Sequence, residues 1–269
     1  MGQENLSLQQ LLNSTTIKKR FEEVLDTSPQ SFISSILSIV RSNSKLQECS
    51  PNSILSAAGI AAALKLPINP SLGFAFIVPY GKQATFQIGA KGLIQLAMRS
   101  GQYLTLNAGS VCEGQIKEID FVTGEIIRGE KISDEIVGYV AFMRLINGFE
   151  KSLYMTIEEL QEHAEKYSQS YAYDLKTGRK SSVWSTNFPA MAKKTVLKLL
   201  LSKFGIISLD QKSVDLAKAL QADQAVITSE GYRYIDNENG EERIVPFNDI
   251  VNFSEEEIPN TEISKDAEE

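Results

Sequence analysis

The sequence predicts an α+β fold: a helical N-terminal region, then a β-hairpin and a small antiparallel β-sheet packed on helices, and an acidic, largely disordered C-terminal tail. Three observations predict it. Apolar residues recur at helical spacing over the first 65 residues, whereas residues 73–88 and 103–155 read as strands separated by turn residues. Residues 225–269 carry 13 acidic and 3 basic residues and have few periodic features. We therefore divide the chain into residues 1–65, 66–224 and 225–269.

Cap and proline signals mark the helices of the first region. Thr15 and Thr16 precede a helix at 17–25, and Pro29 opens a helix over 30–42. Ser50 and Pro51 supply a cap and a first-turn proline for an Ala-rich helix over 52–66. We expect this region to contain the oligomerisation surface, although core packing is the preferred role of the Ala-rich helix.

A strand–turn–strand–helix unit over residues 73–99 is the centre of the predicted fold. A two-proline turn at 66–72 ends the preceding helix, and strands 74–80 and 84–88 flank a turn at 81–83. Pro79 has no N–H to donate, which predicts a sheet edge for its strand. Glycines 89 and 92 bracket the start of the next helix, and Gly101 ends it as a C′ residue.

Residues 103–155 are predicted to form the antiparallel sheet, and helices follow it. The strands are expected at 103–112, 116–121, 126–128, 136–146 and 149–155, the last two joined by the hairpin dipeptide Asn147-Gly148. Thr156 and Glu159 form a capping box for a helix over 157–167. A polar loop at 168–182 then precedes helices over 190–204 and 212–223.

The distribution of charge favours a polyanion as partner, despite a net charge of −7. Residues 1–224 have a balance of +3, and two long blocks contain no Asp or Glu. The first lies between Glu48 and Glu113, and the second covers 175–209. Lys91, Gln95 and Arg99 recur every four residues, so they follow one side of a helix at about 40° intervals. A solvated face is the bland alternative, but solvated faces ordinarily mix both signs.

Aromatic residues accompany these cations and could stack on bases. Core packing is the preferred role of Phe74, Phe76 and Phe86, whereas stacking and packing remain open for Tyr80 and Trp184. The expected contact residues are Tyr80, Lys82, Gln83, Lys91, Gln95, Arg99, Lys176, Arg179, Lys180, Trp184, Asn187, Lys193, Lys194 and Lys198.

Catalytic and metal motifs are missing from the sequence. It has no phosphate-binding GxxxxGK[ST], no GxGxxG and no HExxH, and its one histidine, His163, lies between glutamates on a helix expected to be solvated. A metal-dependent nuclease requires acids in its basic cleft, and the two blocks have none. We therefore expect no catalytic residue and no metal site. The two cysteines, Cys49 and Cys112, stand far apart, and no signal peptide or membrane span is recognisable, which together favour a cytoplasmic protein.

Three stretches resemble the RecT family of phage single-strand annealing proteins. They are GFAFIVPYG from Gly73, FQIGAKGLI from Phe86 and RSGQ from Arg99. Trp184 with the later MAKKT, and VGYVAF from Val137, fit further segments of that family, and the resemblance covers roughly residues 30–205. Ala90 stands where the family often has an aromatic residue.

The resemblance implies a protein that coats single-stranded DNA and anneals it to a complementary strand without ATP. It also implies rings or helical filaments, a partner phage exonuclease, contact with the host single-strand binding protein, and a core akin to that of Red-beta. No cofactor is required, although a divalent cation such as Mg²⁺ could assist, and no membrane is involved. A nucleic-acid coat protein without annealing activity is the alternative, and a nuclease ranks third.

Overall fold

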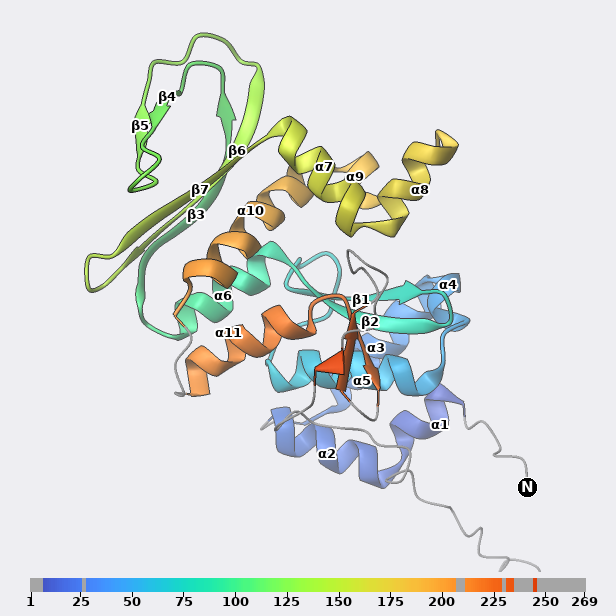
Figure 1. The fold of residues 1–269 in the computed structure, drawn as a ribbon. Helices are drawn as coiled ribbons and strands as arrows, with labels where there is room; N and C mark the ends of the chain where they lie inside the picture. The colour runs from blue at the N-terminus through green and yellow to red at the C-terminus, as the bar shows by residue number, and fades with distance from the viewer. Residues whose placement is uncertain (1–6, 26–27, 207–210, 229–230, 235–243, 246–269) are drawn as a thin grey trace, which may run out of the picture.

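The computed structural model in Figure 1 describes residues 7–25, 28–206, 211–228, 231–234 and 244–245. Its helices are α1 (Leu8–Asn13), α2 (Thr15–Leu25), α3 (Gln30–Ser42), α4 (Ser44–Gln47), α5 (Pro51–Ala63), α6 (Ala90–Arg99), α7 (Ile157–Tyr167), α8 (Gln169–Thr177), α9 (Val183–Thr186), α10 (Phe188–Phe204) and α11 (Gln211–Ala222). Its strands are β1 (Ala75–Tyr80), β2 (Gln83–Ile88), β3 (Tyr103–Cys112), β4 (Ile116–Ile119), β5 (Ile126–Arg128), β6 (Ile136–Leu145), β7 (Glu150–Thr156), β8 (Ala225–Thr228), β9 (Gly231–Tyr234) and β10 (Ile244–Val245). The predicted α+β class is confirmed.

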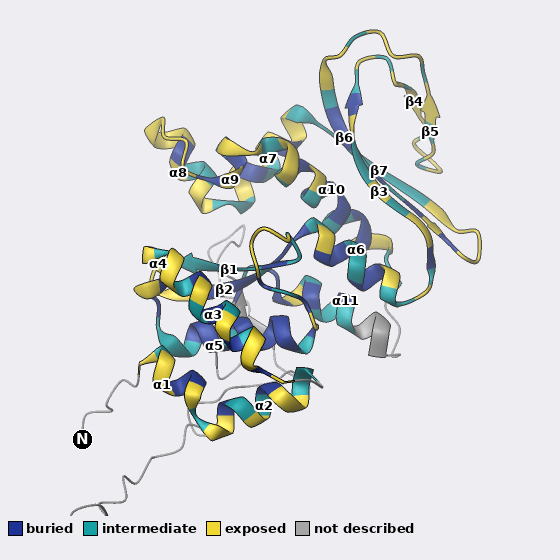
Figure 2. Ribbon diagram, turned by 180° about the vertical axis from the view of Figure 1, so that it is seen from behind, coloured by how far each residue is buried: buried dark blue, intermediate teal, exposed yellow. Residues whose placement is uncertain are grey.

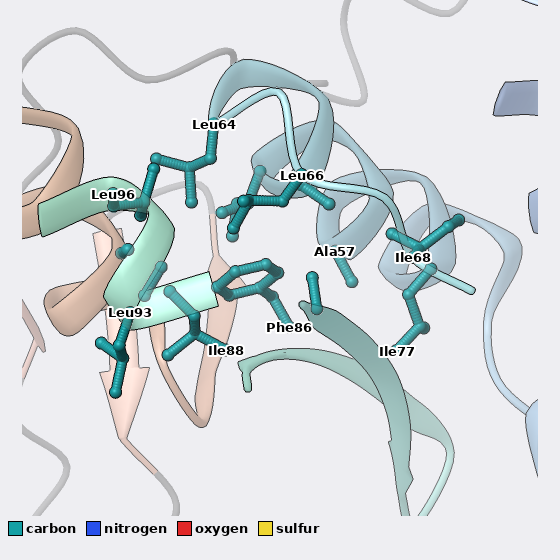
Figure 3. Close-up of a cluster of buried hydrophobic side chains, with 14 of the residues drawn as sticks. Ala57, Leu64, Leu66, Ile68, Ile77, Phe86, Ile88, Leu93 and Leu96 are labelled. Carbon is teal, nitrogen blue, oxygen red and sulfur yellow. The ribbon is translucent and has the colours of Figure 1, made fainter. Parts of the chain in front are cut away.

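The β1–β2 hairpin lies on helix α5, and its turn is tied to the start of that helix. Ser50 is the N-cap of α5, and its backbone N–H donates to the carbonyl oxygen of Lys82 in the turn at 2.9 Å. Ser53 accepts a 2.8 Å hydrogen bond from the backbone N–H of Ala84. Figure 3 shows Phe86 of β2, which is fully buried, pointing into a cluster with Leu66 and other apolar side chains of this core.

Two glycines allow helix α6 to begin against the start of the hairpin. The N–H of Gly89 donates to the carbonyl oxygen of Phe74 at 2.8 Å. A Cβ on Gly89 would lie 2.1 Å from the carbonyl oxygen of Gly73, and a Cβ on Gly92 would lie 2.2 Å from that of Phe74. No side chain fits at either position, so the spacing of these glycines follows from close backbone packing. Gly101, with φ of +71°, follows the C-cap of α6 as expected.

The second sheet has the order β3-β6-β7, and helix α10 packs against all three strands. Both strand pairs are antiparallel, with Val140 opposite Gly109 on one side and Tyr154 on the other. Val196, Leu197 and other apolar residues of α10 are fully buried in this contact. Strands β4 and β5 form a separate hairpin that folds back beside this sheet (Figure 1).

Two parts of the chain differ from the sequence-based expectations. The expected polar loop at 168–182 contains helix α8, because the hydroxyl of Ser168 accepts from the N–H of Tyr171 and caps it, and α9 begins after the cap residue Ser182. The expected disordered tail begins with strands β8, β9 and β10, which form an antiparallel sheet. Ala225 on β8 is 1% exposed and belongs to the same core as the hairpin, so the core continues beyond residue 224. Residues 246–269 lie outside the described part of the chain.

Candidate nucleic-acid interface

The first acid-free block presents two cations close to the β1–β2 hairpin. Lys82 is exposed at the hairpin turn, and Lys91 is exposed in the first turn of α6. Gln83 is exposed next to Lys82, whereas Tyr80 and Gln95 are half-buried. Because the turn is bonded to α5 and the start of α6 is packed on residues 73 and 74, just before β1, both lysines project from fixed backbone.

Arg99, the last residue of the expected stripe on α6, points into the protein. Its Nη1 and Nη2 atoms donate to the backbone carbonyl oxygens of Leu64 and Lys65 at 2.6 and 3.0 Å. These carbonyls belong to the C-terminal end of α5, where helical carbonyls lack intrahelical partners. The guanidinium therefore joins α6 to α5, and the predicted role of Arg99 in contacting DNA has no support from its position.

The second block contributes exposed cations in the last turn of helix α8 and in the loop that follows it. Lys176, Arg179 and Lys180 are all exposed, and the guanidinium of Arg179 lies 5.7 Å from the ring centre of Tyr173. Tyr173 is 49% exposed, so this cation and this ring form one accessible surface. Asn187 is exposed nearby in the chain, at the N-cap of α10.

Asp174 holds this loop in place. Its carboxylate is 2% exposed and accepts hydrogen bonds from the N–H and hydroxyl of Ser181, the N–H of Ser182 and the hydroxyl of Ser185, at 2.7 to 2.9 Å. The pKa of Asp174 lies far below its usual range, and the largest cause is the hydrogen bond from the Ser181 hydroxyl. The charge is thus satisfied internally and adds no negative surface to the loop.

Trp184 is buried rather than available to bases. It is 6% exposed and lies between Tyr171 and Phe188, with ring centres 6.2 and 5.4 Å away. Phe188 in turn meets Tyr139 of β6 at 6.3 Å. These four rings join α8, α9 and α10 to the main sheet, so of the two roles left open for Trp184 the structure favours packing.

The three lysines of α10 are divided between surface and interior. Lys193 is exposed, but Nζ of Lys194 and of Lys198 lie 3.4 and 2.6 Å from the carboxylate of Asp223. Asp223 is 1% exposed at its side chain and also accepts from the backbone N–H of Ile88 at 2.9 Å. Both ammonium groups thus pair inside the protein and join α10 to the end of β2, and their positions give no support to the predicted DNA contacts of Lys194 and Lys198.

Burial and charge oppose each other in this cluster. Burial alone would raise the pKa of Asp223, but the two lysines and the hydrogen bonds outweigh it, so the pKa lies below its usual range. Burial and the nearby Lys198 lower the pKa of Lys194. His163 on α7 was expected to be solvated, but it is half-buried against Tyr167. Burial, and after it the charge of Lys198, lowers the pKa of His163.

Six expected cations remain exposed, and they are Lys82, Lys91, Lys176, Arg179, Lys180 and Lys193. In both views the hairpin and helix α8 project to the same side of the molecule (Figures 1 and 2). Sequence reasoning missed Asp174, which directly precedes the second block, and Asp223, which lies 14 residues after its end. The only signal was the group of serines at 181, 182 and 185, which is typical of caps and turns.

The described residues contain no group of three or more His, Cys, Asp or Glu that could hold a metal ion. Within the same ranges, no helix is both long and apolar enough to cross a bilayer. The exposed residues of the candidate interface described above supply cations, amides and one tyrosine ring, and these groups suit a phosphodiester backbone with exposed bases.

Comparison with known proteins gives matches over most of the chain. The model of the RecT family matches residues 30–244. The protein YqaK of Bacillus subtilis (strain 168) is 41% identical over 230 residues, which are 85% of this chain and 78% of YqaK. Protein RecT of Escherichia coli (strain K12) is 28% identical over 219 residues, which are 74% of this chain and 76% of that protein.

Proposed function

The chain belongs to the RecT family, and on that basis we propose that it binds single-stranded DNA and promotes the annealing of complementary strands without ATP. The observation that supports this most directly is the separation of charge in the interface. Six cations from both acid-free blocks are exposed, while the carboxylates of Asp174 and Asp223 are buried and paired. A strand bound there meets the exposed cations, and the buried carboxylates of Asp174 and Asp223 do not repel it.

Annealing by such a surface needs no chemical step from the protein. Duplex formation is downhill by about 1.4 kcal/mol per stacked step. Phosphate repulsion between the strands and pairing within each strand oppose it, and bound cations reduce the first of these. Sequence is read by the complementary strand, so side chains need only hold the backbone and leave base edges free. We expect no nucleotide requirement, and Mg²⁺ would act only by screening.

We propose further that the protein assembles into rings or filaments on single-stranded DNA, with the annealed duplex as an intermediate. Coating a long strand requires adjacent copies, and a head-to-tail contact between identical subunits generates either form. A phage exonuclease and the host single-strand binding protein are the expected protein partners, in the cytoplasm of a bacterial host.

Annealing is tested with two complementary oligonucleotides, one carrying a fluorophore and one a quencher, without ATP and with either Mg²⁺ or a chelator. Accelerated quenching at unchanged strand length supports the proposal. Protection without acceleration would instead indicate a coat protein, and shortened strands would indicate a nuclease. Each of these two results overturns annealing as the function.

The interface is tested by Lys82→Ala combined with Lys91→Ala, and by Arg179→Ala combined with Lys180→Ala. Single-strand binding depends on salt with a slope of about 0.7 per neutralised phosphate, so six cations predict a slope of up to about 4. Each double variant should lower that slope by about 1.4. The matched control is Lys18→Ala with Lys19→Ala on α2, which should leave it unchanged. Equal slopes in all variants would show that another surface binds DNA.

A further inference from the structure

The β4–β5 hairpin and its flanking residues, 113–135, form an arm that carries the most exposed apolar side chains among the described residues. Phe121 is 96% exposed, Val122 is 76% exposed, and Ile132 is 75% exposed. Figure 2 shows the exposed colour along much of this hairpin, which lies beside the main sheet. Exposed aromatic and aliphatic residues gathered at one projecting element are typical of interaction surfaces.

The tip of the arm is held in one conformation. Oδ1 of Asp120 accepts hydrogen bonds from the N–H groups of Val122 and Thr123, both at 2.8 Å. Nζ of Lys151 on β7 donates to the carbonyl oxygen of Thr123 at 2.6 Å, which ties the turn to the main sheet. Phe121 and Val122 are thus presented outward on a fixed turn, and a fixed turn loses little conformational entropy when it docks.

The arm also differs in charge from the rest of the folded chain. Residues 113–135 contain seven acidic and three basic residues, a balance of −4, whereas residues 1–224 as a whole have a balance of +3. An acidic arm disfavours DNA as its ligand and favours a basic protein surface with an apolar floor.

Helix α3 provides a surface with those properties. A shallow, open hollow lies along its outer face, lined by Ser34, Leu37, Ser38, Arg41 and Ser42. Leu37 is half-buried and supplies an apolar floor, while Arg41 is exposed and supplies a cation. Helix α3 contains no acidic residue.

We propose that the arm of one copy docks on the α3 hollow of a second copy, with Phe121 on Leu37 and the acidic flank of the arm facing Arg41. The arm and α3 lie far apart in both views (Figures 1 and 2). After docking, the copy that used its arm keeps a free hollow and its neighbour keeps a free arm, so the contact repeats head to tail. A separate protein on the arm is the competing occupant.

This contact gives a structural basis to the self-assembly that is part of the proposed function, and it rests on that assembly. The sequence alone suggested an oligomer contact made by the N-terminal helices, whereas the proposed contact joins one of those helices to the arm of another copy. Helix α3 belongs to the N-terminal region that the sequence suggested, but the arm does not.

The first experiment is sedimentation velocity of the full chain, with and without a single-stranded oligonucleotide. The tip variant combines Phe121→Ser with Val122→Ser, and the hollow variant is Arg41→Glu. Loss of one anchoring aromatic should weaken self-association on the order of 30-fold. The matched control is Leu104→Ser, which removes a side chain that is 64% exposed on β3 and should assemble like the wild type.

Mixing the two variants gives the decisive result. Each variant alone should remain monomeric, but the tip variant keeps an intact hollow and the hollow variant keeps an intact arm. An equimolar mixture should therefore form a dimer of one copy of each and nothing larger. A tip variant that assembles like the wild type overturns the contact, as does a mixture that stays monomeric, and the latter result fits a separate protein partner. A wild-type protein that stays monomeric even on DNA overturns the self-assembly itself, while annealing is read separately.

Discussion

Replacing Asp223 by Asn should destabilise the fold strongly, although the change is small in volume. The wild-type carboxylate neutralises Lys194 and Lys198, whose side chains are 12% and 30% exposed. Breaking a buried ion pair by removing one partner costs about 3–5 kcal/mol, because the remaining charge stays buried without compensation. Lys198 is partly solvated, so the low end applies, at about 3 kcal/mol. For a chain of this size, that lowers the midpoint of thermal unfolding by about 6–12 °C.

The measurement is thermal unfolding followed by circular dichroism at pH 7, at low salt and in 1 M NaCl. A buried cluster is weakly screened, so the difference should persist at high salt. The control is Asp215→Asn on α11. Burial raises the pKa of Asp215, which means that folding opposes its charge, so this variant should be as stable as the wild type or slightly more stable.

A variant with Asp223→Asn that unfolds within about 2 °C of the wild type would refute the argument. A second variant separates charge from packing: Asp223→Asn with Lys194→Met and Lys198→Met removes all three charges and keeps a side-chain oxygen that accepts from the N–H of Ile88. Since no uncompensated charge is then left buried, it should recover most of the lost stability. Failure to recover would show that the packing at this site, and not the uncompensated charge, carries the effect.

Three further predictions concern the other internal side chains. Trp184→Ala should lose about 3–5 kcal/mol in denaturant unfolding, while the fluorescence of this single, buried tryptophan should hardly change when single-stranded DNA binds; strong quenching by DNA would contradict its packing role. Arg99→Lys should lose about 1.5–3 kcal/mol, nearly as much as Arg99→Ala, because an ammonium cannot match a guanidinium bonded to two carbonyls; equal stability of wild type and Arg99→Lys would argue against this. The lowered pKa of Asp174 contributes stability that is complete above about pH 4 and is lost as the pH falls through the folded-state pKa. The loss of unfolding free energy in Asp174→Asn, measured in urea, should therefore shrink from pH 7 towards pH 3. A loss that stays constant with pH would show that the carboxylate does not have this role.

Local signals explain which parts of the fold the sequence could predict. Strand β3 and helix α7 have the predicted ends, because Gly101 precedes one and the Thr156–Glu159 capping box starts the other. The two-glycine entry to α6 was also predicted, and its reason is the close approach of Gly92 to the carbonyl of Phe74. Each of these features is decided by residues within a few positions of one another, or by a single residue type that alone fits.

The candidate site could be predicted only in part, because its decisive contacts are remote in sequence. Arg99 reaches carbonyls 34 and 35 residues earlier, and Asp223 lies 25 and 29 residues after the lysines that it pairs with. Helical periodicity shows which residues share a face but not what lies opposite that face. Trp184 shows the same limit, since aromatic residues are suited equally to stacking on bases and to a core.

The internal cations connect the two exposed basic groups to each other. Asp223 accepts from Lys194 and Lys198 on α10 and from the N–H of Ile88, where β2 ends and the chain enters α6. Lys91 lies three residues after Ile88, and Lys193 immediately precedes Lys194, so one buried carboxylate fixes the spacing of cations from both acid-free blocks. If a bound strand contacts both, that spacing must match its phosphates, and a variant at Asp223 should weaken DNA binding even below its unfolding temperature. In the folded chain, Asp223 thus lies between the two acid-free blocks, although it belongs to neither of them in the sequence. Its carboxylate is buried and paired with lysines, so it does not repel a bound strand.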